Sequence, residues 1–368
     1  MLLFDNPFWK THREKTQSLK QISKTFSDPF FVDFVSTYHE ITHSDSKIEV
    51  IPSSPFTKPN YKKYKPPKYP IILCHGLSGF DTLILIPSIK TLAHIISNAI
   101  NNNNSDYFVI TDENEVPLKN VLQVEYWIGV KRELESKGCT VFTAKVPPFG
   151  SIEERATSLN KALNFASEKL QKEGKIPKFN FIAHSMGGLD CRYLISRIPK
   201  EEKKFDVASL TTLSTPHGGS EVANYVVQQY ERISNSLNNT TPLLPLCYYQ
   251  LTTYYAKYFN NITPDDPNVK YFSYGSYFSP KWYSSFSFTW SIINYTTNGE
   301  PNDGMVTVKS SHWGKYMGTL PNTDHLDLIN WRNRFHDTFD QLVKNKKDPE
   351  SILQFYVNIT HDLAEQGC

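Results

Sequence analysis

The sequence predicts an α/β protein with a mainly parallel sheet that is covered by helices on both faces. Short apolar runs alternate with amphipathic helical segments between residues 71 and 213, and the runs end at polar or glycine-rich loops. Strands that alternate with helices are typical of such a sheet. The chain has 368 residues, of which 39% are hydrophobic, so it can fill a large core.

Residues 1–50 are expected to be partly helical, and a segment rich in Pro, Lys and Tyr at 52–70 interrupts regular structure. Strands are expected at 71–74, 140–146, 179–184 and 207–213, and helices at 86–100, 126–137, 152–170 and 186–198. Gly138 predicts the end of the second helix. We therefore expect an N-terminal extension over 1–68 and one domain over 69–368, with an insertion at 221–300.

Composition excludes several classes of protein. The chain has 39 Lys and Arg against 37 Asp and Glu, a formal charge of +2, which argues against a nucleic-acid partner. Its five cysteines form no CxxC pair, so neither a zinc site nor a disulfide framework is indicated. There is no run of 18 strongly apolar residues, so no transmembrane helix is expected.

The N-terminus suggests an intracellular location. It lacks the apolar region of a secretory signal, and residues 1–27 are basic and rich in Ser and Thr, as in a mitochondrial presequence. An exposed helix in a cytoplasmic protein, or in one on a lipid droplet surface, is the alternative. The sequence does not decide whether residues 1–27 are removed.

Ser185 is the strongest candidate for a catalytic residue. It lies in Ala183-His-Ser-Met-Gly187, after a predicted strand and before a predicted helix. A sharp turn there exposes the serine hydroxyl at the carboxyl end of the sheet, and small residues on both sides permit the turn. The alternative interpretation is a serine that caps a glycine-containing helix.

His75, Gly76 and Leu77 follow the first predicted strand and are expected to shape an oxyanion hole. The backbone N–H groups of Leu77 and Met186 are its expected donors. The alternative is an ordinary turn at the end of a strand.

The acid and base of a serine triad follow the nucleophile in the chain in this arrangement. Asp303, in an Asn-Asp-Gly turn, is the candidate acid, and His325 is the candidate base. His217 is expected to line the site, while His312 and Asp206 are rivals for the two roles. His184, next to the nucleophile, is expected to face away.

Taken together, these pieces resemble a known family. The loop at His75–Asp81 and the segments Ala183–Tyr193, Ser214–Ser220, Asn302–Gly304 and Asp324–Asp327 look like those of Pseudomonas/Burkholderia-type bacterial lipases. From about Tyr69 onward, with Glu125–Val130, Gly150–Arg155 and Ser279–Tyr283, the chain more closely resembles fungal intracellular triacylglycerol and diacylglycerol lipases.

The resemblance implies an α/β-hydrolase fold and hydrolysis of glyceride esters at a lipid–water or membrane surface. It implies the triad Ser185, Asp303 and His325, with Leu77 and Met186 as oxyanion donors. A phospholipase or acyltransferase uses the same residues and remains an alternative, as does an inactive lipid-binding protein. Protein partners are not indicated.

The bacterial relatives hold a structural calcium with two Asp side chains. Asp327 matches one of them, but residues 267–299 contain no Asp or Glu to match the other. Calcium prefers several oxygen ligands with carboxylate charge. We therefore expect this site to be lost or weak, and no cofactor is predicted.

Aromatic residues are concentrated in the insertion. Of the 50 Phe, Tyr and Trp residues, 17 lie between residues 246 and 295. Tyr and Trp suit a boundary that is apolar on one side and wet on the other, which favours a lid with an acyl-chain groove. A packed, tyrosine-rich subdomain is the alternative.

Overall fold

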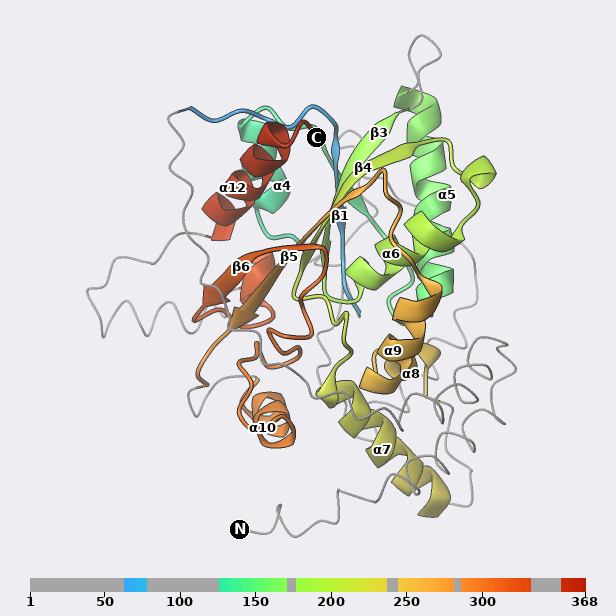
Figure 1. The fold of residues 1–368 in the computed structure, drawn as a ribbon, viewed down its shortest axis with the longest axis vertical. Helices are drawn as coiled ribbons and strands as arrows, with labels where there is room; N and C mark the ends of the chain where they lie inside the picture. Colours follow the sequence, from blue (N-terminus) through green and yellow to red (C-terminus); the bar gives the residue numbers. More distant parts are fainter. Residues whose placement is uncertain (1–62, 78–125, 171–176, 237–243, 281–285, 332–351) are drawn as a thin grey trace, which may run out of the picture.

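The protein is built on a six-stranded parallel sheet, seen edge-on in the computed structural model (Figure 1). The structure describes residues 63–77, 126–170, 177–236, 244–280, 286–331 and 352–368. The strands lie in the order β2-β1-β3-β4-β5-β6, and every pair is parallel. Their bounds are β1 Ile71–Cys74, β2 Val141–Ala144, β3 Lys178–His184, β4 Asp206–Leu213, β5 Lys270–Tyr277 and β6 Lys315–Pro321.

Helices cover both faces of the sheet, because side chains along each strand alternate between the two faces. Ile71 and Leu73 of β1 belong to the apolar cluster formed with α4 (Val130–Ser136) and α12 (Ile352–Glu365). Ile72 and Cys74 of the same strand belong to the cluster formed with α5 (Ile152–Leu170) and α6 (Gly187–Arg197). Figure 1 shows these two helix pairs on opposite sides of the sheet. The predicted α/β class with two covered faces is confirmed.

A third group of helices lies beyond the carboxyl ends of the strands. It comprises α7 (Glu221–Ser236), α8 (Leu246–Gln250), α9 (Thr253–Ile262) and α10 (Ser287–Thr296). All four fall in the segment 221–300 that the sequence analysis treats as an insertion. That segment also contains β5, a strand between β4 and β6, so residues 270–277 belong to the sheet and not to a lid.

Local patterns placed the early elements well. The helix expected at 152–170 has those bounds, and Gly138, with a φ of 87°, follows α4 as expected. Strands β5 and β6 and helix α12 are not predicted from the sequence. The short helices η1 (Lys200–Glu202) and η2 (Asp327–Ile329) complete the set. The helices expected within 1–50 and at 86–100 lie outside the described residues.

The described end of the predicted extension packs on the domain. Lys68 N–H donates to the carbonyl of Cys368 at 2.6 Å, and the Tyr64 hydroxyl bonds with Thr360 Oγ1 at 3.0 Å. In the part of the chain that the structure describes, no helix has both the length and the apolarity needed to cross a membrane. All five cysteines are free and buried.

Candidate functional site

Ser185 occupies a strained turn between β3 and α6. Its φ of 55° lies in the left-handed region, which non-glycine residues rarely adopt. The strand ends at His184 and the helix begins at Gly187. A Cβ at Gly187 would lie 2.6 Å from the His75 carbonyl oxygen, so only glycine permits this approach of helix and strand.

Three predicted residues meet at this turn although they lie far apart in the chain. His325 Nε2 lies 2.9 Å from Ser185 Oγ, and His325 Nδ1 lies 2.8 Å from Asp303 Oδ2. Asp303 is fully buried and His325 is 5% exposed. The histidine thus lies between a hydroxyl and a carboxylate, as a general base with an orienting acid requires.

The buried carboxylate of Asp303 is surrounded by donors. Its Oδ1 accepts from the backbone N–H groups of Met305 at 2.9 Å and Val306 at 2.8 Å. Its Oδ2 accepts from Ser276 Oγ of β5 at 3.3 Å in addition to the His325 ring. Such donors offset the cost of burying a charge. The carboxylate therefore has a fixed orientation toward His325.

The loop after β1 crosses directly over Ser185. A Cβ on Gly76 would lie 2.7 Å from Ser185 Cβ, so this position accepts only glycine. Within the described residues, the backbone N–H groups of Leu77 and Met186 donate to no other group. Met186 stands at the N-terminus of α6, where the helix dipole favours negative charge.

Arg155 of α5 holds this loop. Its Nη2 donates to the carbonyl oxygens of His75 at 2.9 Å and Gly76 at 3.1 Å. Its Nε donates to Asp190 Oδ2 at 2.8 Å, and both side chains are buried. The guanidinium therefore links the loop after β1 to α6.

His75 has a structural role in this geometry. Its Nε2 accepts from Val146 N–H at 3.1 Å, and its Nδ1 lies 2.9 Å from the Gly76 carbonyl, to which it therefore donates. Burial, with the nearby Arg155 charge, lowers the pKa of His75 to about 3. The ring is neutral, and both of its nitrogens serve the loop.

His184 and Tyr126 also contact the site, although neither was predicted from the sequence to have a role there. His184 does not face away from the site, since its ring lies against that of His325, with centroids 4.5 Å apart. The Tyr126 hydroxyl lies 2.7 Å from His184 Nδ1 and accepts from Gly76 N–H at 3.0 Å. Tyr126 belongs to the 125–130 segment noted in the sequence, which was the available signal.

Among the described residues, the other predicted or rival residues contact groups outside the triad. His217 is buried, with Nε2 3.1 Å from Thr212 Oγ1 and its ring stacked on Trp313 at 5.2 Å. Thr215 lies in the same loop as His217, and its Oγ1 donates to the Ser185 carbonyl at 2.8 Å. His312 stacks on Tyr316, and Asp206 is the exposed first residue of β4.

Asp327, the residue that matches a calcium ligand, serves the turn that carries His325. Its Oδ2 accepts from Asp324 N–H at 3.1 Å, and Asp324 Oδ1 accepts in return from Asp327 N–H at 2.9 Å. Among the described residues, no group of three His, Cys, Asp or Glu side chains is arranged to hold a metal. In the described structure Asp327 therefore acts as a partner of Asp324 within this turn.

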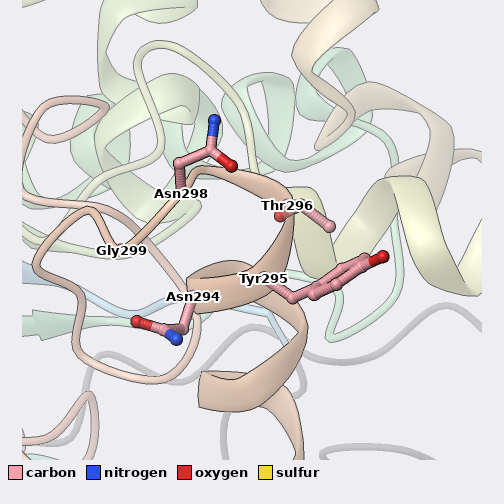
Figure 2. A pocket seen from close by; sticks show the side chains of 5 residues that line it. All are labelled: Asn294, Tyr295, Thr296, Asn298 and Gly299. Atoms are coloured by element: carbon pink, nitrogen blue, oxygen red, sulfur yellow. The ribbon is translucent and has the colours of Figure 1, made fainter. Parts of the chain in front are cut away.

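A separate surface hollow lies at the end of α10 (Figure 2). It is lined by Asn294, Tyr295, Thr296, Asn298 and Gly299. None of these residues belongs to the group around Ser185, so we assign no catalytic role to the hollow.

Comparison with known proteins identifies relatives of this chain. The palmitoyl protein thioesterase family model matches residues 70–334. Triacylglycerol lipase 2 of Saccharomyces cerevisiae is 53% identical over 308 residues, which span 83% of this chain and 94% of the yeast protein. A triacylglycerol lipase of Vibrio cholerae is 26% identical, over 80% of this chain and 88% of the bacterial one.

Solved structures support the fold alone. Lipase 1 from Pelosinus fermentans superposes with a TM-score of 0.50 and 19% identity, over 77% of this chain and all of that one. A metagenomic carboxyl esterase superposes with a TM-score of 0.51 and 14% identity, over 84% of this chain and 79% of that one. Both likenesses agree with the fold described above.

Proposed function

The chain belongs to the palmitoyl protein thioesterase family and is a triacylglycerol lipase, a carboxylic ester hydrolase; from this premise we propose that it removes acyl chains from triacylglycerol and diacylglycerol through an acyl-enzyme on Ser185. The observation that carries the proposal is the hydrogen-bonded line from Ser185 Oγ through His325 to Asp303.

Acylation begins when Ser185 Oγ attacks the ester carbonyl and its proton passes to His325 Nε2. The carbonyl oxygen becomes an oxyanion, which the N–H groups of Leu77 and Met186 stabilise. Each such donor contributes about 3 kcal/mol to the transition state. Asp303 stabilises the imidazolium that forms. The carbon–oxygen bond to glycerol then breaks, and His325 gives its proton to the departing oxygen.

Deacylation repeats the sequence with water. A water molecule attacks the Ser185 ester while His325 Nε2 takes one of its protons. The second tetrahedral species collapses, the fatty acid leaves, and the proton returns to Ser185 Oγ. The products are one fatty acid and a glyceride with one acyl chain fewer.

We propose that α10 faces the lipid. Phe288 and Tyr295 of this helix are 46% and 59% exposed, and residues 286–299 carry no charged side chain. Phe288 also packs edge-on against Tyr225 of α7, with centroids 5.8 Å apart, so the two helices form one aromatic surface. An uncharged surface with exposed aromatic side chains next to the carboxyl ends of the strands suits contact with a glyceride phase.

The catalytic proposal is tested with the Ser185→Ala variant. It should hydrolyse neither a long-chain triacylglycerol emulsion nor a soluble ester, while its thermal unfolding matches that of the wild type. A fluorescent phosphonate that reacts with activated serines should label the wild type and not the variant. Hydrolysis by Ser185→Ala at the wild-type rate would disprove the mechanism.

A second candidate substrate class is the S-acyl thioester, which the description of the matching family favours. The same residues serve this carbonyl, because a thiolate is an easier leaving group than an alkoxide. Rates on glycerides, phospholipids, an acyl-CoA and an S-palmitoyl peptide rank the candidates. The triacylglycerol proposal requires the glycerides to give the highest kcat/KM.

For location, we propose that residues 1–27 direct the protein to mitochondria. This proposal rests on their basic composition rich in Ser and Thr. Residues 1–27 fused to a fluorescent protein should reach mitochondria, and a diffuse or droplet-bound signal would favour the alternatives.

A further inference from the structure

The peptide that joins His75 to Gly76 is bound from two opposite sides. Arg155 Nη2 donates to the His75 carbonyl oxygen at 2.9 Å, and Gly76 N–H donates to Tyr126 Oη at 3.0 Å. The described part of the chain contains no cis peptide bond, and in a trans peptide the C=O and N–H point in opposite directions. Arg155 and Tyr126 together therefore fix the plane of this peptide.

The next peptide carries the candidate oxyanion donor. Its carbonyl, that of Gly76, accepts from Arg155 Nη2 at 3.1 Å and from His75 Nδ1 at 2.9 Å. Its N–H, that of Leu77, consequently points away from Arg155. Since Gly76 borders the nucleophile closely, a rotation of the preceding peptide would move the Leu77 N–H relative to Ser185.

The Tyr126 hydroxyl has one proton and two neighbours, so its hydrogen bonding is determined. A backbone N–H can only donate, so Oη accepts from Gly76 and its own proton goes to His184 Nδ1, 2.7 Å away. His184 then carries its proton on Nε2 and is neutral. Burial lowers the pKa of His184 well below its usual value, which favours this neutral ring. The His184 ring in turn lies against His325.

We propose that Tyr126 is a positioning residue, which sets the Leu77 amide for the oxyanion through the Gly76 backbone and supports the His325 ring through His184. The proposal rests on the function proposed above. Tyr126 acts through these groups and touches no reacting atom. Without its hydroxyl, Gly76 N–H and His184 Nδ1 both lose their partner, and Arg155 holds the peptide from one side only.

The experiment compares Tyr126→Phe with Tyr64→Phe. Tyr64 is the matched control because its hydroxyl also has two partners, Cys139 Sγ and Thr360 Oγ1, both at 3.0 Å and away from the serine. For each variant, kcat and KM are measured on a soluble p-nitrophenyl ester. The inhibition constant of a trifluoromethyl ketone, which forms a tetrahedral oxyanion on the serine, is measured alongside thermal unfolding.

Tyr126→Phe should lower kcat by about 10- to 100-fold, since a displacement below an ångström at an oxyanion donor has effects of this size. KM should change less than about twofold, while the affinity of the ketone falls by the same factor as kcat. Tyr64→Phe should leave kcat and ketone affinity within about twofold of the wild type.

Two results would overturn the proposal. One is a Tyr126→Phe enzyme with wild-type kcat; the other is loss of kcat with unchanged ketone affinity. If Tyr126→Phe does not fold, 3-fluorotyrosine at 126 keeps the shape and weakens the oxygen as an acceptor, and an unchanged kcat then also overturns it. Ser185→Ala separates the proposed catalytic function from the proposed role of Tyr126, because it tests the triad independently of Tyr126.

Discussion

His184 and His325 pack ring against ring, with centroids 4.5 Å apart and planes inclined by 45°. His184, immediately before the nucleophile, thus packs against the ring of the proposed base His325, while Asp303 forms a hydrogen bond with Nδ1 of that ring. Burial, followed by the neighbouring His325, lowers the pKa of His184. The supporting ring is therefore neutral and adds no charge beside the base.

Asp303→Asn should retain the fold and lose most activity. The amide cannot accept from His325 Nδ1 as a carboxylate does, and an amide N–H facing Nδ1 selects the wrong tautomer of the ring. A loss of kcat of about 10⁴-fold is expected, as for other triads with this change. Steady-state kinetics on a soluble ester measure it. A loss of less than about tenfold would exclude Asp303 as the acid.

Ser276→Ala tests the support of that acid. Ser276 Oγ donates to Asp303 Oδ2 at 3.3 Å and bonds with Ser214 Oγ at 3.0 Å. A hydrogen bond to a charged group is worth about 1.5 kcal/mol, so kcat should fall by up to about tenfold. Ser273→Ala is the control, since Ser273 lies buried on the same strand and donates to the Trp313 carbonyl instead. Equal effects of the two changes would indicate a merely structural role.

The proposed lipid-facing surface predicts a separation of two activities. Replacing Phe288 and Tyr295 together with serine should lower hydrolysis of emulsified triacylglycerol several-fold and leave hydrolysis of a dissolved short ester unchanged. The reason is that both side chains are exposed on α10 and take no part in the hydrogen bonds that join Ser185, His325 and Asp303. Phe165→Ser is the matched control, because Phe165 is 49% exposed on α5. If hydrolysis of the emulsion is unchanged, these aromatic residues belong to a packed subdomain and not to a lipid-facing surface.

The turn that carries His325 should lose stability as the pH rises from acidic to neutral. Burial and the neighbouring Asp327 carboxylate raise the pKa of Asp324 to about 7. The folded state therefore binds this proton more tightly than the unfolded chain, in which Asp titrates near 4. The resulting stability is complete below about pH 4 and is lost as the pH rises through about 7.

Asp324→Asn keeps an oxygen that accepts from Leu326 and Asp327 N–H and removes the titration. Its melting temperature should depend less on pH between about 5 and 8 than that of the wild type. Asp206→Asn, at an exposed position, should keep the wild-type dependence. If the melting temperatures of all three proteins depend equally on pH, the raised pKa of Asp324 is contradicted.

The sequence by itself determined the α/β class, the early strands and helices, and Ser185 at its turn. These features are local: apolar runs, helical spacing and small residues around a turn need no distant partner to be recognised. It also nominated Asp303 and His325, because their order in the chain is restricted once the nucleophile is known.

The tertiary structure decided what depends on contacts between distant segments. It placed β5 within the sheet although that strand is as aromatic as the helices around it, because neighbouring strands and not composition determine pairing. It brought Tyr126 between Gly76 and His184, and Arg155 under the loop after β1. The residue type alone does not indicate that Tyr126 or Arg155 holds this loop. The role of a buried hydroxyl or guanidinium is identified only by the groups to which it bonds.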